Sequence, residues 1–270
     1  MLVQKCPMCL ETKEVVSSHL HPAALYLSLR SAEDASPVRV GDDVIMHTDR
    51  QMQQPLLCRG CEDILNKGGE TWTIPKLATA TKSFPLYDIL MKVPAAVGVD
   101  VGGIYLAADN PEIDVTKLTH FGMGIFWKAS VNAWKAKEKE PMIQLGPYSD
   151  SIRTWLRGER GFPENICISI MLSKPERALI ALHGPVMAYR KVWRSFLLYV
   201  PGIAFTLYTG KLLEPEMKET CFYGNTMHPI FVSDQVTGQI WARLAKQFHE
   251  SRKTKSYMAA KAKRTLQRRT

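Results

Sequence analysis

Long hydrophobic runs are scarce in this chain of 270 residues. Its most apolar stretch, residues 196–207, is interrupted by Pro201 and Gly202 and is shorter than the ~20 residues that a membrane helix needs. Residues 1–5 lead directly into a cysteine pair, without the apolar segment of a secretory signal. The sequence therefore predicts neither a membrane span nor secretion, and we expect a cytoplasmic protein.

Cysteines are also few, and four of the six fall in two Cys-x-x-Cys pairs. The pairs are Cys6-Pro-Met-Cys9 and Cys58-Arg-Gly-Cys61. In a reducing compartment such pairs are more often metal sites than disulfides. Four thiolates from two tight turns suit one tetrahedral zinc ion, which would staple two distant segments together. The sequence therefore predicts a closed, structural Zn²⁺ site made of these four cysteines.

The other two cysteines, Cys167 and Cys221, have no partner at metal-ligand spacing. Cys167 lies in an apolar run and is expected to pack as a small hydrophobic residue. The chain also lacks internal repeats, and 46% of its residues are hydrophobic and 23% charged. These values are typical of a globular protein of one or two domains.

Acidic residues are nearly absent from the C-terminal segment, residues 242–270, where Glu250 is the only one among ten basic residues. The whole formal charge of +9 therefore lies in this segment. A basic arm on a neutral body favours a polyanionic partner, usually nucleic acid, whereas the alternative is a solvated helix end that only aids solubility. The residues expected to contact nucleic acid here are Lys253, Lys255, Lys261, Lys263 and Arg264.

The hydrophobic spacing predicts an α+β protein with a cysteine module (1–75), a mixed α+β domain of unknown role (76–241) and a basic helix or tail (242–270). Helices are expected at 20–30, 62–67, 84–92, 115–136, 150–156 and 233–249. Extended segments are expected at 44–46, 166–172, 186–190 and 196–208. Gly68 and Gly69 are expected to end the helix that begins at Glu62.

The segment Ser18-His19-Leu20-His21-Pro22 lies between the two cysteine pairs. A small polar residue, histidine, an apolar residue, any residue and proline, set between two Cys-x-x-Cys pairs, resembles the zinc-containing bacterial branch of the HNH (ββα-metal) endonucleases. The residues that carry this resemblance are Cys6, Cys9, Ser18, His19, Pro22, Cys58, Cys61 and Glu62. The resemblance covers about the first 75 residues, and it implies a small zinc-stapled ββα-metal module.

The resemblance also implies an activity, the metal-dependent hydrolysis of phosphodiester bonds in DNA. His19 would act as the general base, because histidine ordinarily titrates near neutral pH. A catalytic Mg²⁺ or Mn²⁺ ion, held by His19 and Glu62, would polarise the phosphate and stabilise the leaving oxygen. Free-standing nucleases of this kind in bacteria often serve in defence against phage or mobile DNA.

The chain departs from the family pattern at three positions. Gln53 is the nearest substitute for the family's asparagine, and Ser18 replaces the acidic residue that often precedes the general base. Glu62 stands where the last histidine is usual, followed by Asn66 and Glu70, so the catalytic metal depends mainly on Glu62. These departures keep open a non-catalytic zinc-binding subunit that binds nucleic acid or protein in a larger complex or homo-oligomer.

Each candidate residue also has a purely structural interpretation. Glu62 would then only favour the helix dipole, and His19 would only hydrogen-bond beside the proline. Arg59 would contact either a phosphate or solvent, His21 would be structural or contact phosphate, and His47 would reach the site from a strand only in a minor alternative. A nuclease requires His19 and Glu62 to face one solvent-open groove, whereas opposite faces would favour the binding subunit.

Overall fold

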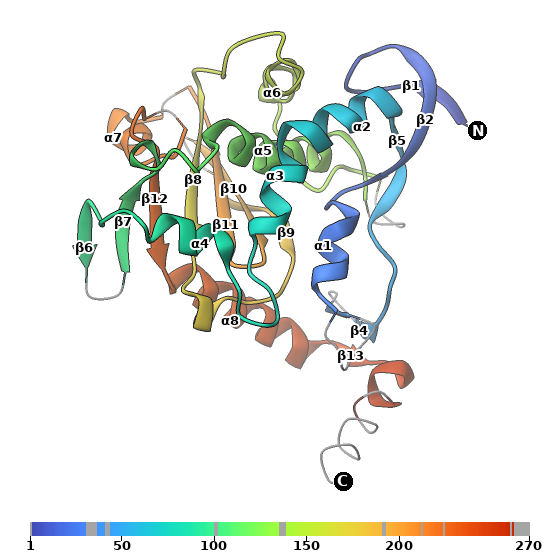
Figure 1. Ribbon diagram of the computed structural model, residues 1–270. Coiled ribbons are helices and arrows are strands. Elements are labelled where there is room, and N and C mark those ends of the chain that lie inside the picture. The colour runs from blue at the N-terminus through green and yellow to red at the C-terminus, as the bar shows by residue number, and fades with distance from the viewer. Residues whose placement is uncertain are drawn as a thin grey trace.

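The computed structural model describes residues 2–30, 37–40, 44–99, 102–134, 139–190, 193–211, 213–223, 225–259 and 261, which form a mixed α+β structure, as the sequence predicts (Figure 1). The strands are β1 (Leu2–Lys5), β2 (Thr12–His19), β3 (Val38–Val40), β4 (Val44–His47), β5 (Gln53–Cys58), β6 (Val97–Val99), β7 (Gly102–Leu106), β8 (Ile166–Leu172), β9 (His183–Arg190), β10 (Arg194–Val200), β11 (Ile203–Thr209), β12 (Pro229–Ser233) and β13 (Arg252–Lys253). The helices are α1 (Ala23–Ser28), α2 (Arg59–Leu65), α3 (Thr71–Thr73), α4 (Pro85–Leu90), α5 (Val115–Val131), α6 (Tyr148–Leu156), α7 (Pro215–Glu219) and α8 (Gln235–Glu250).

A seven-stranded sheet in the order β6-β7-β12-β8-β11-β10-β9 forms the centre of the molecule. Most neighbours are antiparallel, but β12 lies parallel to β8. The run predicted at 196–208 is the β10–β11 hairpin, which turns at Pro201 and Gly202 and pairs Val200 with Ile203. Gly202 has a φ of +81°, a conformation that side chains with a Cβ rarely adopt, so the predicted turn is confirmed with a physical reason for its glycine.

Helices cover both faces of this sheet because the strands β10 and β11 are apolar on both sides. Phe196 and Leu198 belong to the main core cluster, on the face covered by α5. Leu197 and Tyr199 point to the opposite face and pack with Ile240 of α8. This alternation follows from the period of two residues in a strand, and it makes the sheet the middle layer between two helices (Figure 1).

Helix α5 is buried along most of its length, with every residue from Leu118 to Ala129 inside the protein. The side chain of Asp114 caps its start by accepting a hydrogen bond from the backbone N–H of Lys117 at 2.9 Å. Near its end, the indole Nε1–H of Trp134 donates to the carbonyl of Lys128 at 2.8 Å. The helix ends at Val131, somewhat before the predicted residue 136.

The N-terminal segment forms a small sheet in the order β1-β2-β5, and α2 begins directly where β5 ends. β2 and β5 are antiparallel, and their ladder places His19 opposite Gln53. The predicted parts 1–75 and 76–241 share one cluster of buried hydrophobic side chains, in which Leu57 and Leu65 join Phe121 of α5. The strand–strand–helix unit is therefore packed directly on the central helix.

The prediction that Gly68 and Gly69 end the helix after the second cysteine pair is wrong. The chain instead continues from α2 through a π-helical turn, η1 (Asn66–Glu70), into α3 and a short 3₁₀ turn at Ile74–Lys76. A Cβ built on Gly69 would lie 2.5 Å from the backbone N of Phe121 and 2.8 Å from the carbonyl O of Lys117. The glycines are thus needed for the close approach of this helix to α5, and not for a turn.

The C-terminal segment is partly folded onto the N-terminal part of the chain. The predicted helix is confirmed as α8, which ends at Glu250 and is followed by β13. β13 pairs in parallel with β4, and the backbone N–H of Thr254 donates to the carbonyl of Ile45 at 3.0 Å. At least the start of the basic segment is therefore tied to the β3–β4 hairpin (Figure 1).

Candidate functional site

The four paired cysteines come together at one end of the small sheet. Cys6 and Cys9 lie in the turn between β1 and β2, which is closed by a hydrogen bond from the N–H of Leu10 to the carbonyl of Cys6. Cys58 ends β5 and Cys61 lies in the first turn of α2. The ladder pairs Val15 with Cys58, so the β2–β5 register brings the second pair to the first.

All four Sγ atoms lie within 4.8 Å of one another, and those of Cys9 and Cys58 are 3.9 Å apart. Four sulfur atoms bonded at about 2.3 Å to one tetrahedral ion would be about 3.8 Å apart, so the cluster has the dimensions of a closed metal site. Among the residues that the structure describes, this is the only group of three or more histidine, cysteine or acidic side chains placed to share an ion. The cluster can hold a structural metal ion.

The surroundings of Cys6 favour its thiolate, whereas burial raises the pKa of Cys9 and of Cys61. Burial raises the pKa of Cys6, but hydrogen bonds from the backbone N–H groups of Cys58, Cys9 and Met8 outweigh it and lower this pKa to about 7. The guanidinium Nη1 of Arg157 donates to the Sγ of Cys61 at 3.8 Å. Hydrogen bonds and positive charge directed at sulfur stabilise the deprotonated form that binds metals.

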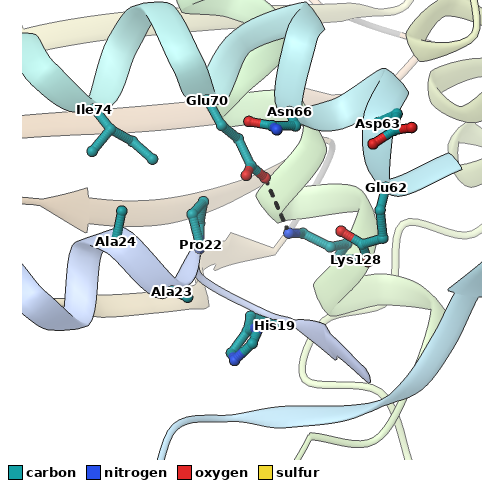
Figure 2. Close-up of a pocket in the computed structure, with 10 residues that line it drawn as sticks. All are labelled: His19, Pro22, Ala23, Ala24, Glu62, Asp63, Asn66, Glu70, Ile74 and Lys128. Atoms are coloured by element: carbon teal, nitrogen blue, oxygen red, sulfur yellow. Dashed lines mark hydrogen bonds and ion pairs between the residues drawn. The ribbon is translucent and has the colours of Figure 1, made fainter. Parts of the chain in front are cut away.

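A cleft of about 300 Å³ opens beside this frame (Figure 2). One wall is formed by the end of β2 and the start of α1, and the other by the face of α2, η1 and the turn that follows. Lys128 of α5 lies between the two walls. The residues that line the cleft are His19, Pro22, Ala23, Ala24, Glu62, Asp63, Asn66, Glu70, Ile74 and Lys128.

His19 and Glu62 line the same cleft from opposite walls. His19 is the last residue of β2 and is half-buried, and Glu62 lies in the first turn of α2. The Oε1 atom of Glu62 is buried and has no hydrogen-bond partner among the described residues. An unpaired buried carboxylate oxygen beside a cleft is an unsatisfied acceptor, and a cation or a proton donor would satisfy it.

Ser18 and Gln53, the two other departures from the family pattern, have different surroundings. The fully buried hydroxyl of Ser18 accepts a hydrogen bond from the N–H of Leu57 at 3.0 Å, beside an irregularity in the β2–β5 ladder. Ser18 therefore contributes to the pairing of the strands. Gln53 lies opposite His19 in the ladder but is exposed, and it is not among the residues that line the cleft.

The three remaining candidates from this region lie away from the cleft lining. The ring of His47 stacks on that of Tyr257, with their centroids 5.7 Å apart. Arg59 is exposed at the start of α2. His21 is buried, and its burial, together with the charge of Lys128, lowers its pKa to about 3. The burial of His21 fits the structural interpretation, and its side chain is not among those that line the cleft.

The sequence reasoning missed Lys128. Its side chain is only 2% exposed, and its Nζ lies 3.4 Å from the Oε1 of Glu70. The signal in the sequence was a single lysine in the apolar run Phe126-Trp127-Lys128-Ala129, within a helix predicted to be buried. A lysine in such a position needs a partner or a function, because an unpaired buried ammonium group is strongly destabilising.

The basic residues of the C-terminal segment are described only in part. Arg252, Lys253 and Lys255 are exposed, and the Nζ of Lys253 lies 5.0 Å from the ring centre of Phe248. Lys261 is also exposed. Lys263 and Arg264, which the sequence likewise assigns to nucleic-acid binding, lie outside the described residues.

No family model, curated protein or solved structure matches the chain. Function is therefore argued from the geometry of the site and the resemblance in the motif. In the part of the chain that the structure covers, no helix combines the length and the apolar character needed to cross a bilayer.

Proposed function

We propose that the chain is a metal-dependent endonuclease of the HNH type that hydrolyses phosphodiester bonds in DNA. The observation that carries this proposal is the placement of His19 and Glu62 on facing walls of one cleft. Opposite faces of the module would have favoured a binding subunit instead. The order of strand β2, strand β5 and helix α2 is in keeping with the proposal, because it is the order that gives the ββα-metal module its name.

The four-cysteine site would hold Zn²⁺, which four thiolates in this geometry favour. Its role is to hold the β1–β2 turn against the start of α2, and thus to keep Glu62 across the cleft from His19. The ion would be closed off from substrate by its four ligands.

In the proposed reaction, His19 takes a proton from the water molecule that attacks phosphorus. The unpaired oxygen of Glu62 would hold a divalent cation, for which carboxylates are preferred ligands. A bound Mg²⁺ or Mn²⁺ would supply charge stabilisation for the phosphate and the leaving oxygen. Lys253 and Lys255, both exposed, would contact the DNA backbone outside the cleft.

A second candidate is a non-catalytic zinc-binding subunit that binds nucleic acid or protein. One observation favours it: among the described residues, the cleft does not contain three histidine, cysteine or acidic side chains close enough to share an ion. The exposed basic residues around β13 would then contribute to the nucleic-acid interface.

Plasmid nicking in the presence of Mg²⁺ or Mn²⁺ separates the two candidates. The proposal predicts that His19→Ala lowers the rate by about 100-fold or more, the usual contribution of a general base. His47→Ala is the matched control, because His47 stacks on Tyr257 outside the cleft. Nicking that is equal in wild type and His19→Ala would remove His19 from the mechanism, and absence of nicking by folded, metal-loaded wild type would favour the binding subunit.

A further inference from the structure

Lys128 is the only lysine or arginine among the ten residues that line the cleft. It is held there rigidly, because α5 is buried on all sides and the carbonyl of Lys128 accepts a hydrogen bond from Trp134. Figure 2 shows its side chain extending from α5 toward the space between Glu62 and Glu70. An ammonium group in this position is fixed before any ligand arrives, which is the arrangement that stabilises a bound anion most strongly.

The pairing of Lys128 leaves it able to bind a further group. An ammonium group has three N–H donors, and the ion pair with Glu70 at 3.4 Å engages at most one of them closely. Glu70 is 17% exposed and Lys128 is 2% exposed, and both residues line the cleft, so the pair lies in the wall of the cavity. The donors that remain are within the lining of the cleft.

The net negative charge of the cleft means that an anion needs this ammonium group in order to bind there. Glu62, Asp63 and Glu70 supply three carboxylates and Lys128 one positive charge, which leaves a formal charge of −2 when His19 is neutral. A phosphate entering such a cleft would be repelled. One divalent cation on the wall that carries Glu62 would neutralise this charge, and Lys128 would then be the one lysine or arginine of the cleft lining able to donate to a phosphate oxygen directly.

We infer that Lys128 is the phosphate-binding residue of the cleft and acts together with a divalent cation on the Glu62 wall. The choice of a phosphodiester as the natural ligand rests on the proposed function, whereas the recognition of a phosphate oxygen rests on the cleft itself. Glu70 holds the ammonium group in place while the cleft is empty. Lys128 lies on α5, outside the unit formed by β2, β5 and α2, so the central helix completes the site.

Binding of inorganic phosphate tests this inference without any catalysis. Phosphorus NMR measures the broadening of the phosphate signal by Mn²⁺ bound to the protein. We expect Lys128→Met to weaken phosphate binding by about tenfold or more, because it removes a charged hydrogen bond. Lys128→Arg should retain most of the binding. Lys117→Met is the matched control, since it removes a positive charge from the same helix outside the cleft lining, and its phosphate binding should equal that of wild type.

These variants separate a phosphate-binding lysine from a merely structural one. Phosphate binding in folded Lys128→Met that equals wild type would overturn the inference. If Lys128→Met does not fold, loss of phosphate binding in folded Lys128→Arg would overturn it equally. Nicking assays on the same proteins keep the two proposals apart. If phosphate binding depends on Lys128 but the protein does not nick DNA, the nuclease proposal is rejected and this inference stands. If nicking depends on His19 but not on Lys128, this inference is rejected and the nuclease proposal stands.

Discussion

Replacing Gly69 by alanine tests whether this glycine serves the packing of two helices. Its position is helical, and its added Cβ would lie 2.5 Å from the backbone N and 2.8 Å from the Cα of Phe121. Ordinary contacts between such atoms are about 3.5 Å or longer, so the two helices must separate by roughly 1 Å. The neighbouring atoms are backbone atoms of the buried helix α5, which cannot move aside as a flexible side chain can.

The magnitude follows from two opposing effects. Overpacking in a dense core destabilises by about 1–3 kcal/mol or more, and rigid backbone neighbours place Gly69 at the upper end. Alanine in a helix stabilises by up to about 1 kcal/mol relative to glycine. We therefore expect the free energy of unfolding to fall by about 2 kcal/mol, which corresponds to a thermal midpoint lower by about 4–8 °C.

Thermal unfolding followed by circular dichroism, at one scan rate and with metal present, measures this shift. Gly238→Ala in α8 is the control, because nothing lies within 4 Å of its added Cβ, and it should be neutral or slightly stabilising. A Gly69→Ala protein as stable as wild type, or more stable, would refute the packing argument. That outcome would favour the simpler interpretation of the glycine as a residue of low helix propensity.

Three further predictions concern the metal site, a buried histidine and the basic segment. Cys58→Ser should reduce the bound metal from about one ion per chain to near zero, as measured by plasma mass spectrometry. The control Cys167→Ala should retain the ion. Metal retained in Cys58→Ser would contradict a four-thiolate site. Burial lowers the pKa of His120, so the unfolded state takes up its proton first and stability falls as pH drops below about 6.5. The fall in thermal midpoint between about pH 8 and pH 5 should be shallower in His120→Leu, and equal slopes would exclude this contribution. Replacing Lys253 and Lys255 by glutamine should weaken DNA binding, as measured by fluorescence anisotropy. The slope of the logarithm of the binding constant against the logarithm of salt concentration should fall in magnitude by about 2. Unchanged binding would assign the segment to another partner.

The elements that the sequence predicted well have a strong local signal. Strand β8 spans the predicted residues 166–172, and the β10–β11 hairpin turns at the predicted Pro201 and Gly202. Helix α8 likewise begins and ends close to the predicted bounds. In each case the hydrophobic period and the turn residues lie within a short window, so neighbours in the chain are sufficient to define the element.

The elements that the sequence missed depend on distant partners. The short strand β13 exists because it pairs with β4, which lies some two hundred residues earlier in the chain. The helix that passes through Gly68 and Gly69 continues because α5 packs closely against it. Local propensity predicts a helix end at these two glycines, and tertiary packing overrides that preference.

The sequence by itself determined the four-cysteine cluster that can hold a metal ion, because each Cys-x-x-Cys turn places two thiols together and both pairs need only one strand ladder to meet. It also determined that His19 and Glu62 were the residues to examine. Only the tertiary structure decided that they face one cleft and that Lys128 lies between them, paired with a glutamate 58 residues away. The physical reason is that a buried charge is tolerated only where the fold supplies a partner. The partner of Lys128 is Glu70 of η1, which is placed by the packing of η1 against α5. Gly68 and Gly69 allow these two helices to come close.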